Sequence, residues 1–125
     1  MAFHFVIVHN TMVTIYHNPR CSKSRQTLAL LEDKGISPEV VLYLDTPPDA
    51  ATLDALLKKL GISARQLLRK GEDDYKTNNL GDPSLGEEQL IDAMVRHPKL
   101  IERPIVVNGE RAALGRPPEA VLEIL

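Results

Sequence analysis

The sequence predicts an α/β fold with a central mixed sheet of four strands flanked by helices, and three observations support this. A strand pattern, a helix pattern and a second strand pattern follow one another between residues 13 and 44, as in a βαβ unit. Helical periodicity then dominates residues 49–97. Near the C-terminus an Asn-Gly pair separates two short apolar runs, which indicates a β-hairpin. The predicted order is therefore β-α-β, a helical segment, and β-β-α.

The predicted βαβ unit begins with a short apolar strand at residues 13–16. Its helix starts at Ser22 or Ser24, because serine is a favoured helix start. It ends before Gly35, since glycine suits the left-handed conformation that follows a helix. Residues 39–44 (Glu-Val-Val-Leu-Tyr-Leu) form a nearly continuous apolar run, which is typical of a buried strand.

The helical segment begins at Asp49, which can accept hydrogen bonds from the first turn of a helix. The leucines of residues 53–60 share one face of that helix and predict core packing, and Gly61 ends it. Residues 63–68 indicate another short helix with Arg69 at its end. Because cations are common at helix C-termini, the pattern alone favours a structural role for Arg69.

The rest of the helical segment combines a polar stretch with one more helix. Residues 71–83 are polar and predict an ordered surface loop around Tyr75 and Leu80. Residues 84–87 (Ser-Leu-Gly-Glu) fit a capping box and start a helix that ends before Pro98. The residues of this helix expected to point inward are Leu90, Ile91, Met94 and Val95.

The C-terminal part contains the predicted hairpin and a closing helix. A strand at residues 101–107 is entered through Pro104, and the Asn-Gly pair at 108–109 turns the chain back into a further strand. Pro117 or Pro118 can then begin a last short helix, because proline fits the first helical position. The residues expected to pack this helix are Val121, Leu122 and Leu125.

This order of elements describes a thioredoxin-like domain, in which a βαβ unit is joined by a helical connection to a β-hairpin and a closing helix. In that fold the proline leading into the third strand is cis and lies beside the active thiol. We therefore expect a cis Arg103–Pro104 bond, although only about 5–6% of X–Pro bonds in folded proteins are cis. Residues 12–125 are predicted to form this single domain, and residues 1–11 an upstream extension.

Composition argues against several classes of function. The 15 basic and 17 acidic residues give a formal charge of −2, and no basic run exceeds two residues, which argues against nucleic-acid or membrane-surface binding. The apolar patch near the N-terminus is too short to span a membrane. The four histidines and the single cysteine show no metal-ligand spacing. A lone cysteine also excludes an internal disulfide framework and favours a cytoplasmic location.

The lone cysteine, Cys21, lies where a strand pattern turns into a helix pattern, shortly after Pro19. A helix N-terminus offers unpaired N–H donors and about half a positive charge, and Arg20, Lys23 and Arg25 add further positive charge. Both favour thiolate over thiol. A small buried apolar residue is the alternative for a lone cysteine, but the proline and the basic flanks favour a nucleophile.

Four ordered blocks of sequence resemble the glutaredoxin-linked arsenate reductases, and the similarity runs from about residue 13 to residue 125. The first block surrounds the cysteine and reads Tyr-His-Asn-Pro-Arg-Cys-Ser-Lys-Ser-Arg at 16–25. The other three are Leu-Leu-Arg-Lys at 67–70, Glu-Arg-Pro-Ile-Val-Val at 102–107 and Gly-Arg-Pro-Pro-Glu at 115–119. The chain is most similar to a shorter subgroup of that family.

The resemblance implies a catalytic role for four residues. Cys21 matches the catalytic cysteine, which attacks arsenate to give a thiol–arsenate adduct. Arg69, Arg103 and Arg116 match the three arginines that surround the oxyanion and the thiolate. Planar guanidinium groups suit the oxygens of a tetrahedral oxyanion, so the resemblance replaces the structural interpretation of Arg69.

The resemblance also implies how the site is supported and how it turns over. His17 and Ser24 match positions that support the thiolate, and Arg25 adds charge at the anion site. Because the chain has no second cysteine, the second thiol must come from outside. The family implies glutathione as co-substrate and glutaredoxin as the partner that clears a mixed disulfide, with no bound cofactor.

Two other functions stay open at this stage. One is a glutathione-dependent thiol oxidoreductase of unknown substrate. The other is a regulator of the Spx type, a thioredoxin-like protein that binds RNA polymerase. Redox-sensing regulators of that type use a Cys-x-x-Cys switch, which Ser24 removes here. The phosphatase-like reductases match poorly, because they use Cys-x5-Arg and Thr27 stands at the arginine position.

Overall fold

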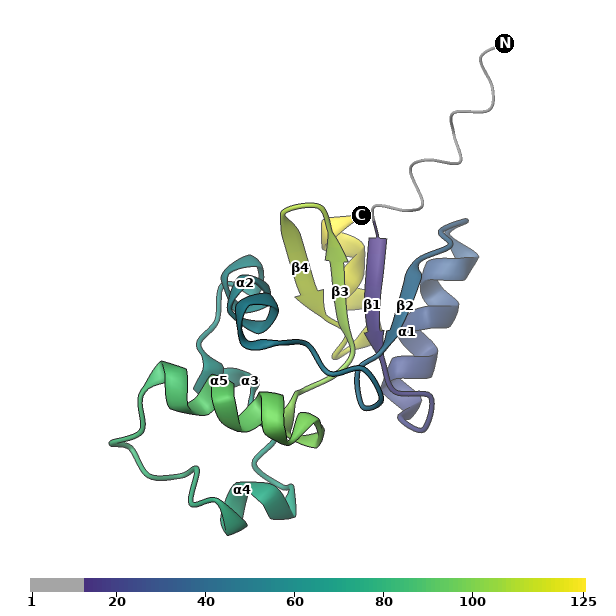
Figure 1. Cartoon of the computed structure of the whole chain (residues 1–125). Helices are drawn as coiled ribbons and strands as arrows, with labels where there is room; N and C mark the ends of the chain where they lie inside the picture. Colours follow the sequence, from purple (N-terminus) through teal and green to yellow (C-terminus); the bar gives the residue numbers. More distant parts are fainter. Residues whose placement is uncertain (1–12) are drawn as a thin grey trace. The chain divides into compact units, whose positions relative to one another are not determined.

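The computed structural model describes residues 13–125, which divide into two compact units. The sheet unit comprises residues 13–42 and 103–125, and the helical unit comprises residues 43–102 (Figure 1). The expected extension at residues 1–11 lies outside the described residues. The single-domain organisation of residues 12–125 stays a prediction.

The sheet unit contains four strands in the order β2-β1-β3-β4. β1 (Val13–His17) runs parallel to β2 (Glu39–Leu42) and antiparallel to β3 (Ile105–Asn108). β3 is in turn antiparallel to β4 (Arg111–Leu114). The predicted mixed four-stranded sheet and thioredoxin-like order of elements are therefore confirmed.

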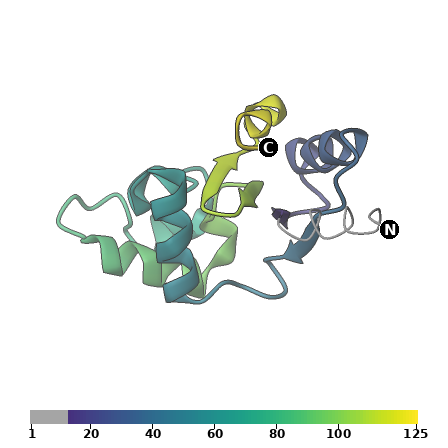
Figure 2. The same ribbon diagram turned by 90° about the horizontal axis from the view of Figure 1, so that it is seen from above.

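Two helices cover one face of this sheet. α1 (Ser22–Asp33) and the 3₁₀ helix η3 (Pro118–Ile124) lie side by side on that face (Figure 2). α1 ends as predicted, with Gly35 in the left-handed region at φ 78°. Burying an aliphatic side chain stabilises the fold by about 1.5–3 kcal/mol. The buried core under these helices consists of Val13, Ile15, Leu31, Val106, Val121 and Ile124.

The structure corrects the expectation of a buried strand at residues 39–44. β2 is an edge strand of the described sheet and ends at Leu42. Val40 and Leu42 are 44% and 39% exposed, whereas Tyr43 just beyond the strand is 1% exposed. An apolar run indicates a strand, but strand order depends on long-range pairing that the run does not encode.

The closing helix also differs from the expectation, because it is a 3₁₀ helix rather than an α-helix. With three residues per turn, buried positions recur every third residue. Pro118, Val121 and Ile124 are accordingly buried. Leu122 and Leu125, which were expected to pack, are exposed.

The helical unit contains four α-helices and a short 3₁₀ helix among its described residues. Asp49 caps the first of them as predicted, since its Oδ1 accepts a hydrogen bond from the Thr52 N–H at 2.8 Å. No helix of the described residues is both long and apolar enough to cross a membrane. The elements are α2 (Ala50–Leu60), α3 (Ala64–Leu67), α4 (Asp73–Thr77), α5 (Glu87–Arg96) and η2 (Pro98–Leu100).

Two local expectations for this unit are wrong. The predicted loop at 71–83 contains α4, a single helical turn with acidic residues at its start, which favour a helix N-terminus. The capping box expected at residues 84–87 does not form, because Gly86 is the N-cap of α5 and the Ser84 hydroxyl bonds to Asp82 instead. Glu87 caps a different helix, since its Oε2 accepts from the Ala64 N–H at 2.8 Å.

Candidate active site

Cys21 occupies the N-cap position of α1, in the loop that follows β1. Its N–H donates to the Asn18 carbonyl and its own carbonyl accepts from the Arg25 N–H, each at 3.0 Å. The residue is partly exposed, and no side chain makes a capping hydrogen bond at this helix start. The first N–H groups of α1 are therefore not satisfied by a side-chain cap, and such groups suit an anion.

His17 and Ser24 form a buried pair next to this loop. The Ser24 hydroxyl lies 2.6 Å from Nδ1 of His17 and accepts a hydrogen bond from the Asn18 N–H at 3.0 Å. We assign the hydrogen of the Ser24 hydroxyl to Nδ1, which leaves the ring proton on Nε2. Burial, and then the charge of Arg25, lower the pKa of His17. His17 is therefore neutral at pH 7.

Asn18 shapes the loop, and sequence reasoning gave it no role. Its Oδ1 accepts from the Arg20 N–H at 3.0 Å, while its carbonyl accepts from Cys21. Asparagine often stabilises a turn in this way, and Asn-Pro was a signal for such a turn. Arg25 fastens the loop from the helix side, because its NH1 donates to the Pro19 carbonyl at 2.9 Å.

The Cys21 loop, Arg103 and Arg116 lie at the same end of the sheet, because they adjoin the ends of β1, β3 and β4. Tyr16 is paired with Ile105, and Ile105 with Leu114, so the residues just beyond these pairs are neighbours. The Arg103–Pro104 bond is cis as predicted, and Arg116–Pro117 is a second cis bond that was not predicted. NH1 of Arg116 donates to the Arg103 carbonyl at 3.2 Å.

Gly115 lies between α1 and the end of β3, a close packing that the sequence did not predict. A Cβ atom at this position would lie 2.4 Å from Thr27 Oγ1 and 2.8 Å from Pro104 Cγ. Thr27 is fully buried, and its hydroxyl donates to the Lys23 carbonyl at 2.8 Å. Only glycine allows this close approach, so Gly115 fixes how near α1 lies to the segment that carries Arg116.

Arg69 lies in the helical unit, where two carboxylates hold it. Its NH1 is 3.1 Å from Glu72 Oε2, and its Nε is 3.5 Å from Glu102 Oε1. The Arg69 side chain is 25% exposed. Glu72 stands three residues further on, across the turn between α3 and α4, and the sequence gave neither glutamate a role. The convergence of Arg69 on Cys21 stays a prediction.

Comparison with known proteins places these features in a family. Residues 16–124 match the ArsC family. The chain belongs to this family. It is 54% identical to a Haemophilus influenzae protein named arsenate reductase, over 90% of this chain and 98% of that one.

Two other similar proteins match nearly the same part of the chain. YfgD of Escherichia coli K12, whose name states no activity, is 67% identical over 90% of this chain and 96% of its own length. The solved structure named arsenate reductase from Vibrio cholerae is 56% identical and superposes with a TM-score of 0.89. That match covers 90% of this chain and 97% of the other.

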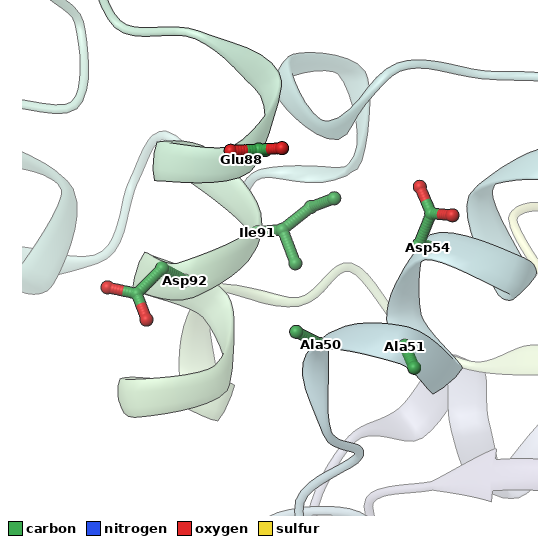
Figure 3. A pocket seen from close by; sticks show the side chains of 6 residues that line it. All are labelled: Ala50, Ala51, Asp54, Glu88, Ile91 and Asp92. Carbon is green, nitrogen blue, oxygen red and sulfur yellow. The ribbon is translucent and has the colours of Figure 1, made fainter.

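In this ArsC family chain, a groove between α2 and α5 contains none of the predicted site residues (Figure 3). It has a volume of about 480 Å³, and Ile91 of α5 points across it toward α2. Two of its three carboxylates pair with a Lys or Arg one turn along their own helix. Among residues 13–125, no three His, Cys, Asp or Glu side chains cluster closely enough to hold a metal ion.

Proposed function

We propose that this protein reduces arsenate to arsenite in the cytoplasm, with Cys21 as the nucleophile and glutathione and glutaredoxin as its thiol partners. The observation that carries the proposal is Cys21 at the start of α1, where no side chain caps the helix and the neutral His17–Ser24 pair is adjacent. Relatives named arsenate reductase at 54% and 50% identity support arsenate as the substrate.

In the first step, the Cys21 thiolate attacks arsenic, an S–As bond forms, and one arsenate oxygen takes up protons and leaves as water. Thiolate and arsenate repel each other because both are negative. The N–H groups of α1 and the guanidinium groups of Arg69, Arg103 and Arg116 offset this repulsion. Each charge-assisted hydrogen bond contributes about 1.5–3 kcal/mol, and donors fixed before the reaction stabilise the developing charge best.

The neutral His17 supports this step without adding a second cation. Its Nδ1 is occupied by the Ser24 hydroxyl, so the ring offers Nε2–H as its donor. A hydrogen bond from this group favours a thiolate. Ser24 therefore acts through His17 and holds the imidazole in one tautomer.

In the second step, an external thiol supplies the electrons, since the chain has one cysteine. The glutathione thiolate attacks the Cys21 sulfur, and an S–S bond forms as the S–As bond breaks. The electron pair of that bond passes to arsenic, which leaves as arsenite. Glutaredoxin then removes glutathione from Cys21 by thiol exchange.

Arsenite production tests this proposal. The purified protein is incubated with arsenate, glutathione, glutaredoxin and a glutathione-regenerating system, beside Cys21→Ser and the exposed control Ser37→Ala. We expect turnover in the wild type and the control, and none in Cys21→Ser. If the wild type forms a Cys21–glutathione disulfide by mass spectrometry but no arsenite, arsenate is discarded and a glutathione-dependent oxidoreductase of another substrate is favoured.

A further inference from the structure

We infer that Glu72 and Glu102 are positioning residues that hold the Arg69 guanidinium in the orientation needed to bind an oxyanion. The three side chains form a compact cluster in the helical unit, and they are 29%, 26% and 25% exposed. The inference rests on the proposed role of Arg69 in oxyanion binding. It gives a role to two residues outside the predicted site: Glu72, and Glu102, which lies in a matched sequence block without an assigned role.

The backbone places Glu102 beside Arg69 across a short antiparallel bridge. Leu68 pairs with Ile101, the Arg69 N–H donates to the Leu100 carbonyl at 2.8 Å, and the Glu102 N–H donates to the Leu67 carbonyl at 3.0 Å. Side chains alternate along such a pair. Arg69 and Glu102 therefore lie diagonally on the same side, within reach of an ion pair.

A tight turn of the chain brings Glu72 next to Arg69. The Glu72 N–H donates to the Arg69 carbonyl at 3.3 Å, and Glu72 is the N-cap residue of α4. Its carboxylate makes no capping hydrogen bond to that helix and instead accepts from Arg69 NH1 at 3.1 Å. The Glu72 carboxylate therefore bonds to Arg69 and does not cap α4.

The two carboxylates contact NH1 and Nε of Arg69 and leave NH2 without a carboxylate contact. A guanidinium carries five N–H donors, and the two contacts engage Nε and one hydrogen of NH1. NH2 has neither of these carboxylate contacts, so its two donors are available for the oxygens of a tetrahedral oxyanion. Holding the side chain in advance also lowers the entropy that is lost when the anion binds.

Arg65 in the same unit shows what a purely structural arginine looks like. Its NH1 donates to the Leu80 carbonyl at 2.9 Å, and its NH2 donates to the Asp82 carbonyl at 3.0 Å. Both terminal nitrogens of Arg65 are thus engaged by neutral backbone groups. Arg69 is held by carboxylates at Nε and NH1, which leaves its NH2 for another acceptor. This contrast favours a binding role for Arg69.

The test separates orientation from charge. Glu72→Gln and Glu102→Gln keep a hydrogen-bond acceptor and remove the negative charge, whereas alanine at either position removes both. We expect the double alanine variant to lose roughly ten- to hundred-fold in kcat/KM for arsenate, as for other misplaced binding groups. Glutamine should restore most of this loss. Glu88→Ala, at an exposed glutamate of the same unit, is the matched control.

A second readout does not depend on turnover. The Arg69 Nε–H signal in the ¹⁵N NMR spectrum, assigned through its loss in Arg69→Lys, should be protected from exchange in the free wild type and in the glutamine variants. Protection should be lost in the alanine variants. If the wild type makes no arsenite, the proposed function fails, and this signal alone decides whether the two glutamates order Arg69.

The inference is overturned if the alanine variants bind and reduce arsenate as well as the wild type, or with a lower KM and unchanged kcat. Either result would mean that the carboxylates only repel the anion. Should the double alanine variant not fold, the single variants Glu72→Ala and Glu102→Ala provide the same test, because each removes one of the two contacts. Positioning then predicts a partial loss in kcat/KM for each single variant, and unchanged values in both would overturn it.

Discussion

The helices of this protein begin in two different ways. α2 and α3 carry complete local caps, with Asp49 accepting from the Thr52 N–H and Ser63 forming a capping box with Gln66. α1 begins at Cys21 without a side-chain cap, as α4 does at Glu72, whose carboxylate bonds to Arg69 instead. A missing cap costs a helix about 1 kcal/mol. The comparison teaches that this cost is tolerated at the helix start where the proposed nucleophile and its anion need the free N–H donors.

A helix that lacks its cap must be held by contacts elsewhere, and α1 has two such anchors. Ser24 in its first turn bonds to His17 and to the Asn18 N–H. Thr27, one turn later, lies against Gly115. The partners of Ser24 and Thr27 belong to the sheet and its loops, so α1 is held by contacts outside the helix. The predictions below remove an anchor from α1 or a cap from another helix.

The largest effect is expected from Ser24→Ala, with Ser63→Ala as the matched change at a capped helix. Ser24→Ala leaves the buried His17 Nδ1 and Asn18 N–H without a partner, and each such group costs about 1–3 kcal/mol. We expect the free energy of unfolding to fall by about 2–4 kcal/mol, against about 1 kcal/mol for Ser63→Ala. Urea denaturation at pH 7 measures both, and equal losses would contradict the comparison.

Gly115→Ala should have the next largest effect, because its methyl group overlaps Thr27 and Pro104. Overpacking of this kind costs about 1–3 kcal/mol, and a shift of this segment should also lower arsenite production through Arg116. Gly71→Ala is the control, since a Cβ atom there meets nothing within 4 Å. Thermal unfolding of the two variants checks this, and similar melting temperatures would show that the contact is no anchor.

The smallest effect concerns the cap of α2 and its dependence on pH. Hydrogen bonds from the backbone N–H and the side chain of Thr52 lower the pKa of Asp49. Because this pKa is lower in the folded state, the stabilisation is complete above the unfolded value of about 4 and is lost as the pH falls through the folded value. The stability difference between wild type and Asp49→Ala should therefore shrink below about pH 4. Urea midpoints across that range would reveal a constant difference if the carboxylate charge played no part.

The candidate site could be predicted only where its signals are local or carried by resemblance. The turn into a helix indicated Cys21, and the matched blocks indicated His17, Ser24 and Arg103. The order of elements predicted the cis bond before Pro104, which the structure contains. Asn18 lies between the predicted strand and the predicted helix, but its three hydrogen bonds depend on how the loop closes. Glu102 was missed because its partner stands 33 residues earlier, as the ion pair 69–102 shows.

The sequence by itself determined the elements, because their signals act within a few residues. Asp49 starts α2, Gly35 ends α1, and the turn at 108–109 joins β3 to β4, as local backbone and capping chemistry require. Only the tertiary structure decided that β2 lies at an edge, that Glu87 caps α3 rather than its own helix, and that Gly115 approaches Thr27. These outcomes depend on packing between segments far apart in the chain, which no short pattern of residues encodes.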